Sequence, residues 1–308
     1  MKRNEPAKGF RKLLRVVLPA FIVLLAGFAG SLVVLTWRVT HPGAVQEPVN
    51  PSHFLLDSRD VTWSGSAGEE MNGWWIAGRR GAPGILLSPG YGMSRSDVLS
   101  LAVPLNNAGF HVLIHAQRGC NPAGTGASSL GLYEKDDMES ALGFMRAQPG
   151  VDAGRLGAWG ADEGARAALA MAASHPEVLA IAADTPYEYV LEFLTVRLRE
   201  ELGTGNSLIE YGCRQVFRLS HLGSYGAAAE PLPLDPLADR NILFIQGSNR
   251  KEMAPLVASL YGRLGPKKEM MSLPASRSRL LSGAELKNYD RQVADFFRKN
   301  LAATGNRD

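Results

Sequence analysis

Cysteine is scarce in this chain of 308 residues, which contains only Cys120 and Cys213. Two cysteines are too few for a disulfide-based scaffold or a four-cysteine zinc site. They can form one disulfide or remain two buried thiols, and the sequence leaves both alternatives open. The chain also lacks a His-Glu-x-x-His sequence, paired cysteines and a phosphate-binding glycine loop. We therefore expect no bound metal and no organic cofactor.

Strong charge of one sign is also missing from most of the chain. The formal net charge is +3, but six basic residues precede Val16 and only Glu5 opposes them there. The remaining residues comprise 27 basic and 29 acidic side chains, a net charge of −2. Binding to the phosphate backbone requires a basic surface, so we expect no nucleic-acid partner.

A long uncharged run follows the basic segment of residues 1–15. The 22 residues Val16–Trp37 carry no charge, and as a helix they reach about 33 Å, enough to cross a hydrocarbon core of about 30 Å. We predict a transmembrane anchor at 16–37; a signal peptide cleaved near 26–31 and a buried helix are the alternatives. The basic residues before the run predict a cytoplasmic amino terminus and an extracytoplasmic main domain in a single-pass protein of the cell membrane.

The remaining sequence is organised as a linker and one large domain. Residues 38–58 contain several prolines and are predicted to be the linker, and 59–303 alternates between short apolar runs and amphipathic segments. This alternation predicts a mostly parallel sheet covered by helices on both faces, an α/β fold. The insertion at about 186–232 is predicted to form a helical cap. Strands are expected at 60–64, 73–76, 84–88, 111–115, 155–159, 178–183, 241–246 and 269–273, and helices at 97–108, 135–146, 163–174, 251–264 and 284–300.

Four segments in order along the chain resemble the α/β-hydrolase superfamily, in particular its bacterial serine-hydrolase and S33 peptidase-like branch. They are 84–95 (GILLSPGYGMSR), 109–119 (GFHVLIHAQRG), 131–137 (GLYEKDD) and 155–164 (RLGAWGADEG). The resemblance extends from about residue 52 to 303. It implies the α/β-hydrolase fold, with a nucleophile elbow between the strand and helix around residue 162.

The resemblance places the small elbow residues at Gly160 and Gly164 and the nucleophile position at Asp162, where this branch has serine. Aspartate tolerates the positive φ of an elbow better than most residues do, so the geometry can survive the substitution. The backbone amides of Tyr91 and Glu163 correspond to the donors of the oxyanion hole.

The other two triad positions also depart from the family pattern. Arg250 stands at the position of the family acid, with Glu252 nearby if the register differs, and Ser278 stands in the loop of the family histidine. No histidine follows His221. Since a serine hydrolase needs a general base in that loop, the triad is predicted to be degenerate. Ser88 and Ala116 likewise replace the histidine and aspartate that the family has in its first two segments.

Three hypotheses account for Asp162. It can be a helix N-cap that accepts backbone amides, or it can pair with Arg250 in a rebuilt polar pocket. It can also be a true nucleophile, as the aspartate is in haloalkane dehalogenases and epoxide hydrolases. That chemistry needs a histidine base, and His221 in the predicted cap is the candidate.

Other candidate residues have simpler structural interpretations. Asp184 is a displaced triad acid or part of a turn, and Cys120 is a structural thiol rather than a nucleophile. His111 and His115 are interpreted as core or strand-edge residues. Arg277 and Arg279 are solvated loop charges or, together with Arg250, give the pocket affinity for anions.

The function that follows is a membrane-anchored protein with a degenerate triad, which binds a ligand or partner through the cleft and cap. The alternative is an active hydrolase of esters, peptides, epoxides or haloalkanes that uses Asp162 and a relocated base. A scaffolding role at the membrane is a third possibility, and the fold alone does not decide among them.

Overall fold

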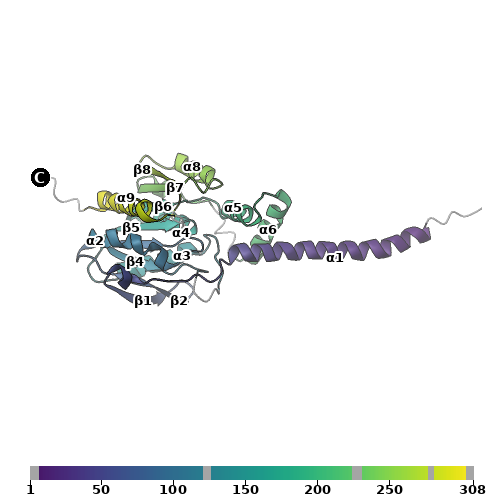
Figure 1. The fold of residues 1–308 in the computed structure, drawn as a ribbon, viewed down its shortest axis with the longest axis horizontal. Helices are drawn as coiled ribbons and strands as arrows, with labels where there is room; N and C mark the ends of the chain where they lie inside the picture. The colour runs from purple at the N-terminus through teal and green to yellow at the C-terminus, as the bar shows by residue number, and fades with distance from the viewer. Residues whose placement is uncertain (1–6, 121–125, 224–230, 277–280, 303–308) are drawn as a thin grey trace, which may run out of the picture.

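A long amino-terminal helix projects from a layered α/β domain (Figure 1). The structure is a computed structural model that describes residues 7–120, 126–223, 231–276 and 281–302. The predicted triad replacement Ser278 and the loop arginines 277 and 279 lie outside the described residues. Helix α1 (Ala7–Thr40) is long and apolar enough over Leu14–Thr40 to cross a membrane.

The domain is built on an eight-stranded sheet in the order β1-β2-β4-β3-β5-β6-β7-β8. The strands are β1 (Ser58–Ser64), β2 (Glu70–Ile76), β3 (Ala82–Ser88), β4 (His111–His115), β5 (Val151–Ala161), β6 (Val178–Asp184), β7 (Asn241–Gly247) and β8 (Lys268–Leu273). β1 and β2 run antiparallel to their neighbours, and the strands from β4 to β8 are parallel. The predicted mostly parallel sheet is confirmed.

Both faces of the sheet are covered because the central strands are apolar on both sides. Ile85 and Leu87 of β3 pack toward α2 (Leu99–Asn107) and α9 (Gly283–Leu301). Leu86 points the other way, toward α3 (Glu134–Arg146), α4 (Glu163–Ser174) and α8 (Ala254–Arg263). Alternate residues of a strand face opposite sides, so one uninterrupted apolar run builds two cores.

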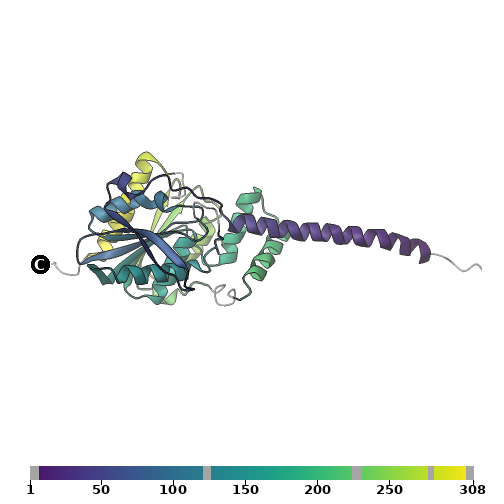
Figure 2. The same cartoon turned by 90° about the horizontal axis from the view of Figure 1, so that it is seen from below.

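A third apolar cluster joins the cap helices to the end of α1. The cap helices α5 (Val190–Leu202) and α6 (Ser207–Ser220) lie between β6 and β7 in the chain, within the predicted 186–232 insertion. Phe193 and Phe217 of these helices pack in one cluster with Leu32 and Val39 of α1. Figures 1 and 2 show the cap helices at the end of the domain from which α1 projects. The candidate membrane helix is therefore packed against the cap.

Several element boundaries differ from the sequence prediction. α1 begins before the expected 16–37 segment and continues to Thr40, because the flanking lysine, arginine and leucine residues are good helix formers. The expected linker 38–58 contains the 3₁₀ helix η1 (Pro51–Phe54), and the helix expected at 97–108 is divided into η2 (Arg95–Val98) and α2. A further 3₁₀ helix, η3 (Asp235–Leu237), precedes β7.

Candidate functional site

The turn between β5 and α4 has the strained backbone of a nucleophile elbow. Asp162 adopts φ 48° and ψ −116°, a conformation that costs about 1–3 kcal/mol for a residue with a side chain. A Cβ atom at Gly160 would lie 2.2 Å from the carbonyl oxygen of Gly164, and one at Gly164 would lie 2.7 Å from that of Ser88. Strand and helix backbones approach too closely here for any other residue.

The side chain of Asp162 pairs with Arg250. Nη2 of Arg250 lies 3.3 Å from Oδ1, and Nη1 lies 3.5 Å from Oδ2. Asp162 occupies the N-cap position of α4, but its side chain makes no capping bond to the helix. The predicted position is therefore confirmed, and the expectation that its carboxylate accepts backbone amides was wrong. A side chain that caps a helix usually belongs to a residue with extended backbone, and Asp162 has a positive φ instead.

The pair extends into a row of alternating charges that reaches the cap, which we name the cap ladder: Asp162, Arg250, Glu200 and Arg197. Nε of Arg250 lies 3.3 Å from Oε1 of Glu200, and Glu200 is also paired with Arg197 of the same helix. The guanidinium of Arg197 lies 4.1 Å from the ring centroid of Tyr91, a cation–π contact. The ladder connects the elbow to α5 through side chains alone.

Burial and ion pairing shift the pKa values of Asp162 and Arg250 in opposite directions. Burial raises the pKa of Asp162, while the neighbouring Arg250 and Arg197 lower it in part. The carboxylate of Asp162 in turn raises the pKa of Arg250 above its ordinary value. Only 6% of the Asp162 side chain and 11% of the Arg250 side chain are exposed. Removing one partner of such a buried pair is strongly destabilising, because the charge that remains is neither paired nor solvated.

Tyr91 belongs to the loop after β3, where the family resemblance places an oxyanion-hole amide. Its hydroxyl donates a hydrogen bond of 2.6 Å to the carbonyl oxygen of Val39 in α1. Its ring also contacts that of Phe193 in α5, edge to face at 6.5 Å. The side chain of Tyr91 therefore ties the loop to both the cap and the candidate membrane helix.

Glu163, the first residue of α4, brings a second carboxyl group to the elbow. It is completely buried, and neither carboxyl oxygen has a hydrogen-bond partner among the described residues. Burial raises its pKa well above the ordinary value, and the nearby Asp162 and Glu134 carboxylates raise it further. The uncharged, protonated form is therefore favoured in the folded chain. From the sequence, only the backbone amide of Glu163 was predicted to belong to the site.

None of the six histidines hydrogen-bonds to or forms an ion pair with the side chain of Asp162, and all six lie in the described ranges. The ring of His221 packs on Phe217 at 4.4 Å, and its Nδ1 lies 2.9 Å from the Phe217 carbonyl oxygen. Burial lowers the pKa of His115 to about 4. His111 accepts a hydrogen bond from the Gly78 amide and bonds to the Gly150 carbonyl through its other nitrogen. His41, His53 and His175 make their bonds in other parts of the chain.

Asp184, the candidate for a displaced acid, ends β6 and takes part in a buried hydrogen-bond network. The Tyr289 hydroxyl donates to it at 2.8 Å, and the Thr185 hydroxyl donates at 2.7 Å. The indole nitrogen of Trp159 donates to the Tyr289 hydroxyl at 3.0 Å. The carboxylate of Asp184 is thus held by the hydroxyl groups of Thr185 and of Tyr289 in α9.

The remaining sequence candidates are Glu252 and the two cysteines. Glu252 is about half exposed and pairs with Arg199 at 3.1 Å, so a shifted register does not bring it to the elbow. Cys120 and Cys213 are both buried free thiols. Burial raises the pKa of Cys120 to about 12, which makes it a poor nucleophile.

Several polar residues near the elbow belong to other elements and were not predicted from the sequence. Arg197 and Glu200 of the ladder lie three residues apart on α5 and have opposite charges, a pattern usually found on solvated helix faces. Glu134 accepts the backbone amides of Ser129 and Gly131 at 2.9 and 2.8 Å. Only the tertiary fold shows which residues of other elements these side chains contact.

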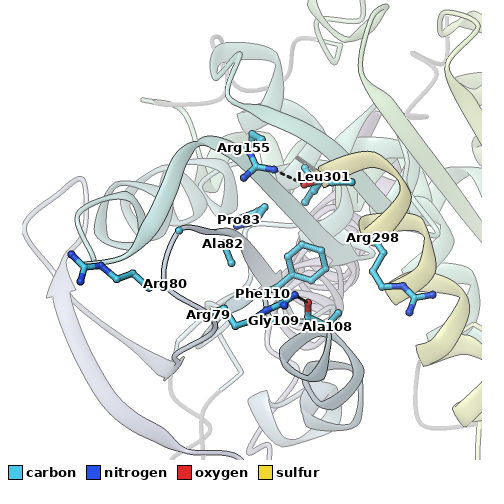
Figure 3. Close-up of a pocket in the computed structure, with 12 residues that line it drawn as sticks. Arg79, Arg80, Ala82, Pro83, Ala108, Gly109, Phe110, Arg155, Arg298 and Leu301 are labelled. Atoms are coloured by element: carbon cyan, nitrogen blue, oxygen red, sulfur yellow. Dashed lines mark hydrogen bonds between the residues drawn. The ribbon is translucent and has the colours of Figure 1, made fainter. Parts of the chain in front are cut away.

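A cavity of about 460 Å³ lies at the opposite end of the central strands, where β3 and β4 begin. Its arginines do not converge on the cavity: Arg80 and Arg298 point away from it in Figure 3. Arg79 donates to the Ala108 carbonyl at 2.8 Å, and Arg155 donates to the Leu301 carbonyl at 3.0 Å (Figure 3). The elbow, not this cavity, therefore remains the candidate site.

Comparison with known proteins identifies the fold. No family model matches the chain. Similar solved structures include an esterase of Pyrococcus furiosus, with a TM-score of 0.65 and 18% identity over 85% of this chain and 98% of that one. They also include the α/β hydrolase GrgF of a Penicillium species, with a TM-score of 0.58 and 16% identity over 80% and 100% of the two chains. The chain has the α/β-hydrolase fold.

The α/β-hydrolase fold predicted from four sequence segments is confirmed. Identities of this size show the fold and do not transfer an esterase activity. Two uncharacterised proteins of Mycobacterium tuberculosis, from strains H37Rv and CDC 1551, are each 27% identical over 162 residues. The match covers 50% of this α/β-hydrolase-fold chain and 57% of each relative, so it spans little more than half of their length.

Proposed function

We propose that this chain is a membrane-anchored α/β-hydrolase-fold protein that binds a ligand or partner and does not hydrolyse substrates. The observation that carries the proposal is the ion pair between Asp162 and Arg250. It occupies the two positions where the resemblance expects a nucleophile and an acid. The fold supplies the cap, and the chemistry must come from the residues themselves.

The contacts of Asp162 disfavour nucleophilic catalysis. A carboxylate nucleophile forms an ester that water must hydrolyse, and this step needs a base to accept the proton of the water. The guanidinium of Arg250 is a permanent donor and accepts no proton. Glu163 favours its protonated form, and none of the six histidines hydrogen-bonds to the side chain of Asp162.

The membrane anchor and its orientation belong to the same proposal. α1 is apolar enough to span a bilayer, and six basic residues precede its uncharged run. The positive-inside rule then puts the amino terminus in the cytoplasm and residues 38–308 outside it. In this arrangement the cap lies beside the membrane surface.

The competing function is hydrolysis by Asp162 with a relocated base. One observation favours it: the elbow keeps its strained positive-φ backbone at Asp162 although the serine is gone. Strain of this kind often marks functional sites. Packing between β5 and α4 also requires the same turn, because Gly160 and Gly164 leave no room for Cβ atoms.

Isotope labelling distinguishes the two functions. The full chain, in lipid nanodiscs and ¹⁸O water, is given aryl esters, peptide amides, epoxides and haloalkanes. An aspartate nucleophile takes solvent oxygen into its carboxylate when the ester intermediate is hydrolysed. We expect no ¹⁸O in the peptide containing Asp162 and no activity that Asp162→Asn removes. Asp295→Asn, at an exposed position of α9, is the control, and label on Asp162 with Asp162-dependent turnover would overturn the proposal.

A further inference from the structure

Cap helix α6 exposes large apolar side chains along one side. Spacings of three, eight and three residues put them within one stripe of the helix surface. The opposite side is packed, with Cys213 and Phe217 fully buried. The exposed side chains, which we name the α6 stripe, are Leu208, Tyr211, Leu219 and, just after the helix, Leu222, with exposed fractions from 63% to 74%.

α6 touches the candidate membrane helix within its apolar run. Sγ of Cys213 lies 3.8 Å from the carbonyl oxygen of Leu32. A Cβ atom at Gly212 would lie 2.5 Å from a methyl carbon of Leu32, so glycine allows the two helices to approach closely. Both Figure 1 and Figure 2 place α6 alongside α1.

The position of this contact along α1 gives the depth of α6 relative to the membrane surface. Leu32 precedes Trp37 by five residues, which is about 7.5 Å along a helix axis. If Trp37 marks the membrane surface, α6 meets α1 below that surface. Amphipathic helices that lie in a membrane interface bury their apolar side by about 5–10 Å, so the two depths agree. Val33 and Val34 of α1 remain more than half exposed at the same level.

We infer that α6 is an interfacial helix and that the α6 stripe lies in the bilayer that α1 crosses. The inference rests on the proposed membrane anchor. The bilayer is the occupant that fits, because the stripe lies on the helix packed against α1 and at the end of the domain from which α1 projects. Tyrosine is typical of membrane interfaces, and apolar side chains grouped in this way are rarely left in water.

This placement gives the cap a second attachment to the membrane. α1 would hold the domain at one point, and α6 would hold the cap flat on the surface. Because α6 packs with α5 in one apolar cluster, the bilayer would also fix the helix that contributes Arg197 and Glu200 to the cap ladder. The bilayer would in this way act on the elbow through α5 and the cap ladder.

Spin labels test the inference in the full chain. Single substitutions Leu208→Cys and Leu219→Cys are labelled in nanodiscs of phosphatidylcholine and phosphatidylglycerol, with Val33→Cys and Asp295→Cys as references. The unsubstituted chain measures labelling of the native cysteines, which are buried. Collision with oxygen reports lipid, and collision with a water-soluble nickel complex reports solvent. We expect labels at 208 and 219 to match position 33, accessible to oxygen and protected from nickel, while position 295 is accessible to nickel.

The reference labels at positions 33 and 295 show whether a negative result concerns α6 or the membrane anchor. Nickel access at 208 and 219 with lipid exposure at 33 would overturn the interfacial helix and leave the anchor intact. Nickel access at 33 as well would overturn the proposed anchor together with this inference. Protection of 208 and 219 from both reagents would mean that a second copy or another protein covers the stripe, which also overturns the inference.

Discussion

The hydroxyl of Tyr91 donates a hydrogen bond to the carbonyl oxygen of Val39, and this bond joins the loop beside the elbow to the last turn of α1. The amide of Ser128 donates to the next carbonyl, that of Thr40, at 2.8 Å. Carbonyl groups at the end of a helix have no partner within it. Here the α/β domain supplies two donors, so the end of α1 is fixed to the domain.

Replacing Tyr91 with phenylalanine should weaken this junction. The change leaves the Val39 carbonyl without its partner, and loss of such a bond costs about 1–2 kcal/mol of unfolding free energy. Thermal unfolding of the full chain in detergent measures the loss as a lower midpoint. Tyr211→Phe, at an exposed position of α6, is the matched control, and equal midpoints for the two variants would contradict the prediction.

Removing Arg250 should destabilise the fold much more than removing a surface arginine. Arg250→Ala leaves a buried Asp162 carboxylate without a partner, which costs about 3–5 kcal/mol. Adding Asp162→Asn should restore part of that loss, since the uncompensated charge is then gone. Arg298→Ala, whose side chain is 61% exposed, should change stability by about 0.5 kcal/mol or less. Denaturant titration of the unsubstituted chain, Arg250→Ala, Asp162→Asn and the double variant gives the coupling, with Arg298→Ala as the control, and additive losses would rule the coupling out.

Glu163 should make the stability of the chain depend on pH. Burial raises the pKa of its carboxyl group well above the ordinary value, so the folded state keeps a proton that the unfolded state loses as pH rises past about 4.5. Stability therefore falls with increasing pH in this range. Glu163→Gln removes the effect, and its stabilisation should grow from near zero at pH 4 to a clear increase at pH 8. Glu285→Gln, at an exposed position, serves as the control; a gain from Glu163→Gln that is the same at both pH values would be inconsistent with this explanation.

The proposed topology predicts which positions react from outside the cell. A cysteine at Asp295, half exposed on α9, should react with a membrane-impermeant maleimide on intact cells. A cysteine in place of Lys8 should react only after the cells are permeabilised, because the basic residues hold the amino terminus in the cytoplasm. Mass shift of the labelled protein is the readout, and the reverse labelling pattern would invert the topology.

The sequence predicted the elements that local patterns define. The strand at His111–His115 and the helix at Glu163–Ser174 have the expected bounds, because apolar runs and alanine-rich segments specify them locally. These elements depend on neighbours in the chain. The elbow glycines were predicted from the family resemblance instead, and the structure gives the reason for them: a Cβ atom at Gly160 would meet Gly164, and one at Gly164 would meet Ser88 of β3.

The cap ladder could not be predicted in the same way. Arg250 reaches Asp162 across 88 residues of sequence, and the resemblance suggested that pair by placing both at triad positions. No such guide existed for Arg197 and Glu200, because helical periodicity does not say which side of α5 meets the elbow. The unpartnered carboxyl group of Glu163 was missed for a similar reason: an acidic residue in the first turn of a helix is usually solvated.

The two buried free thiols have a consequence for how the proposed extracytoplasmic domain matures. Cys120 and Cys213 are unpaired in the fold, so its stability comes from its apolar cores and buried polar networks and requires no oxidative step. A chain of this kind can fold as soon as it leaves the membrane, without help from a thiol oxidase. It should also tolerate reducing surroundings that inactivate disulfide-dependent exported proteins.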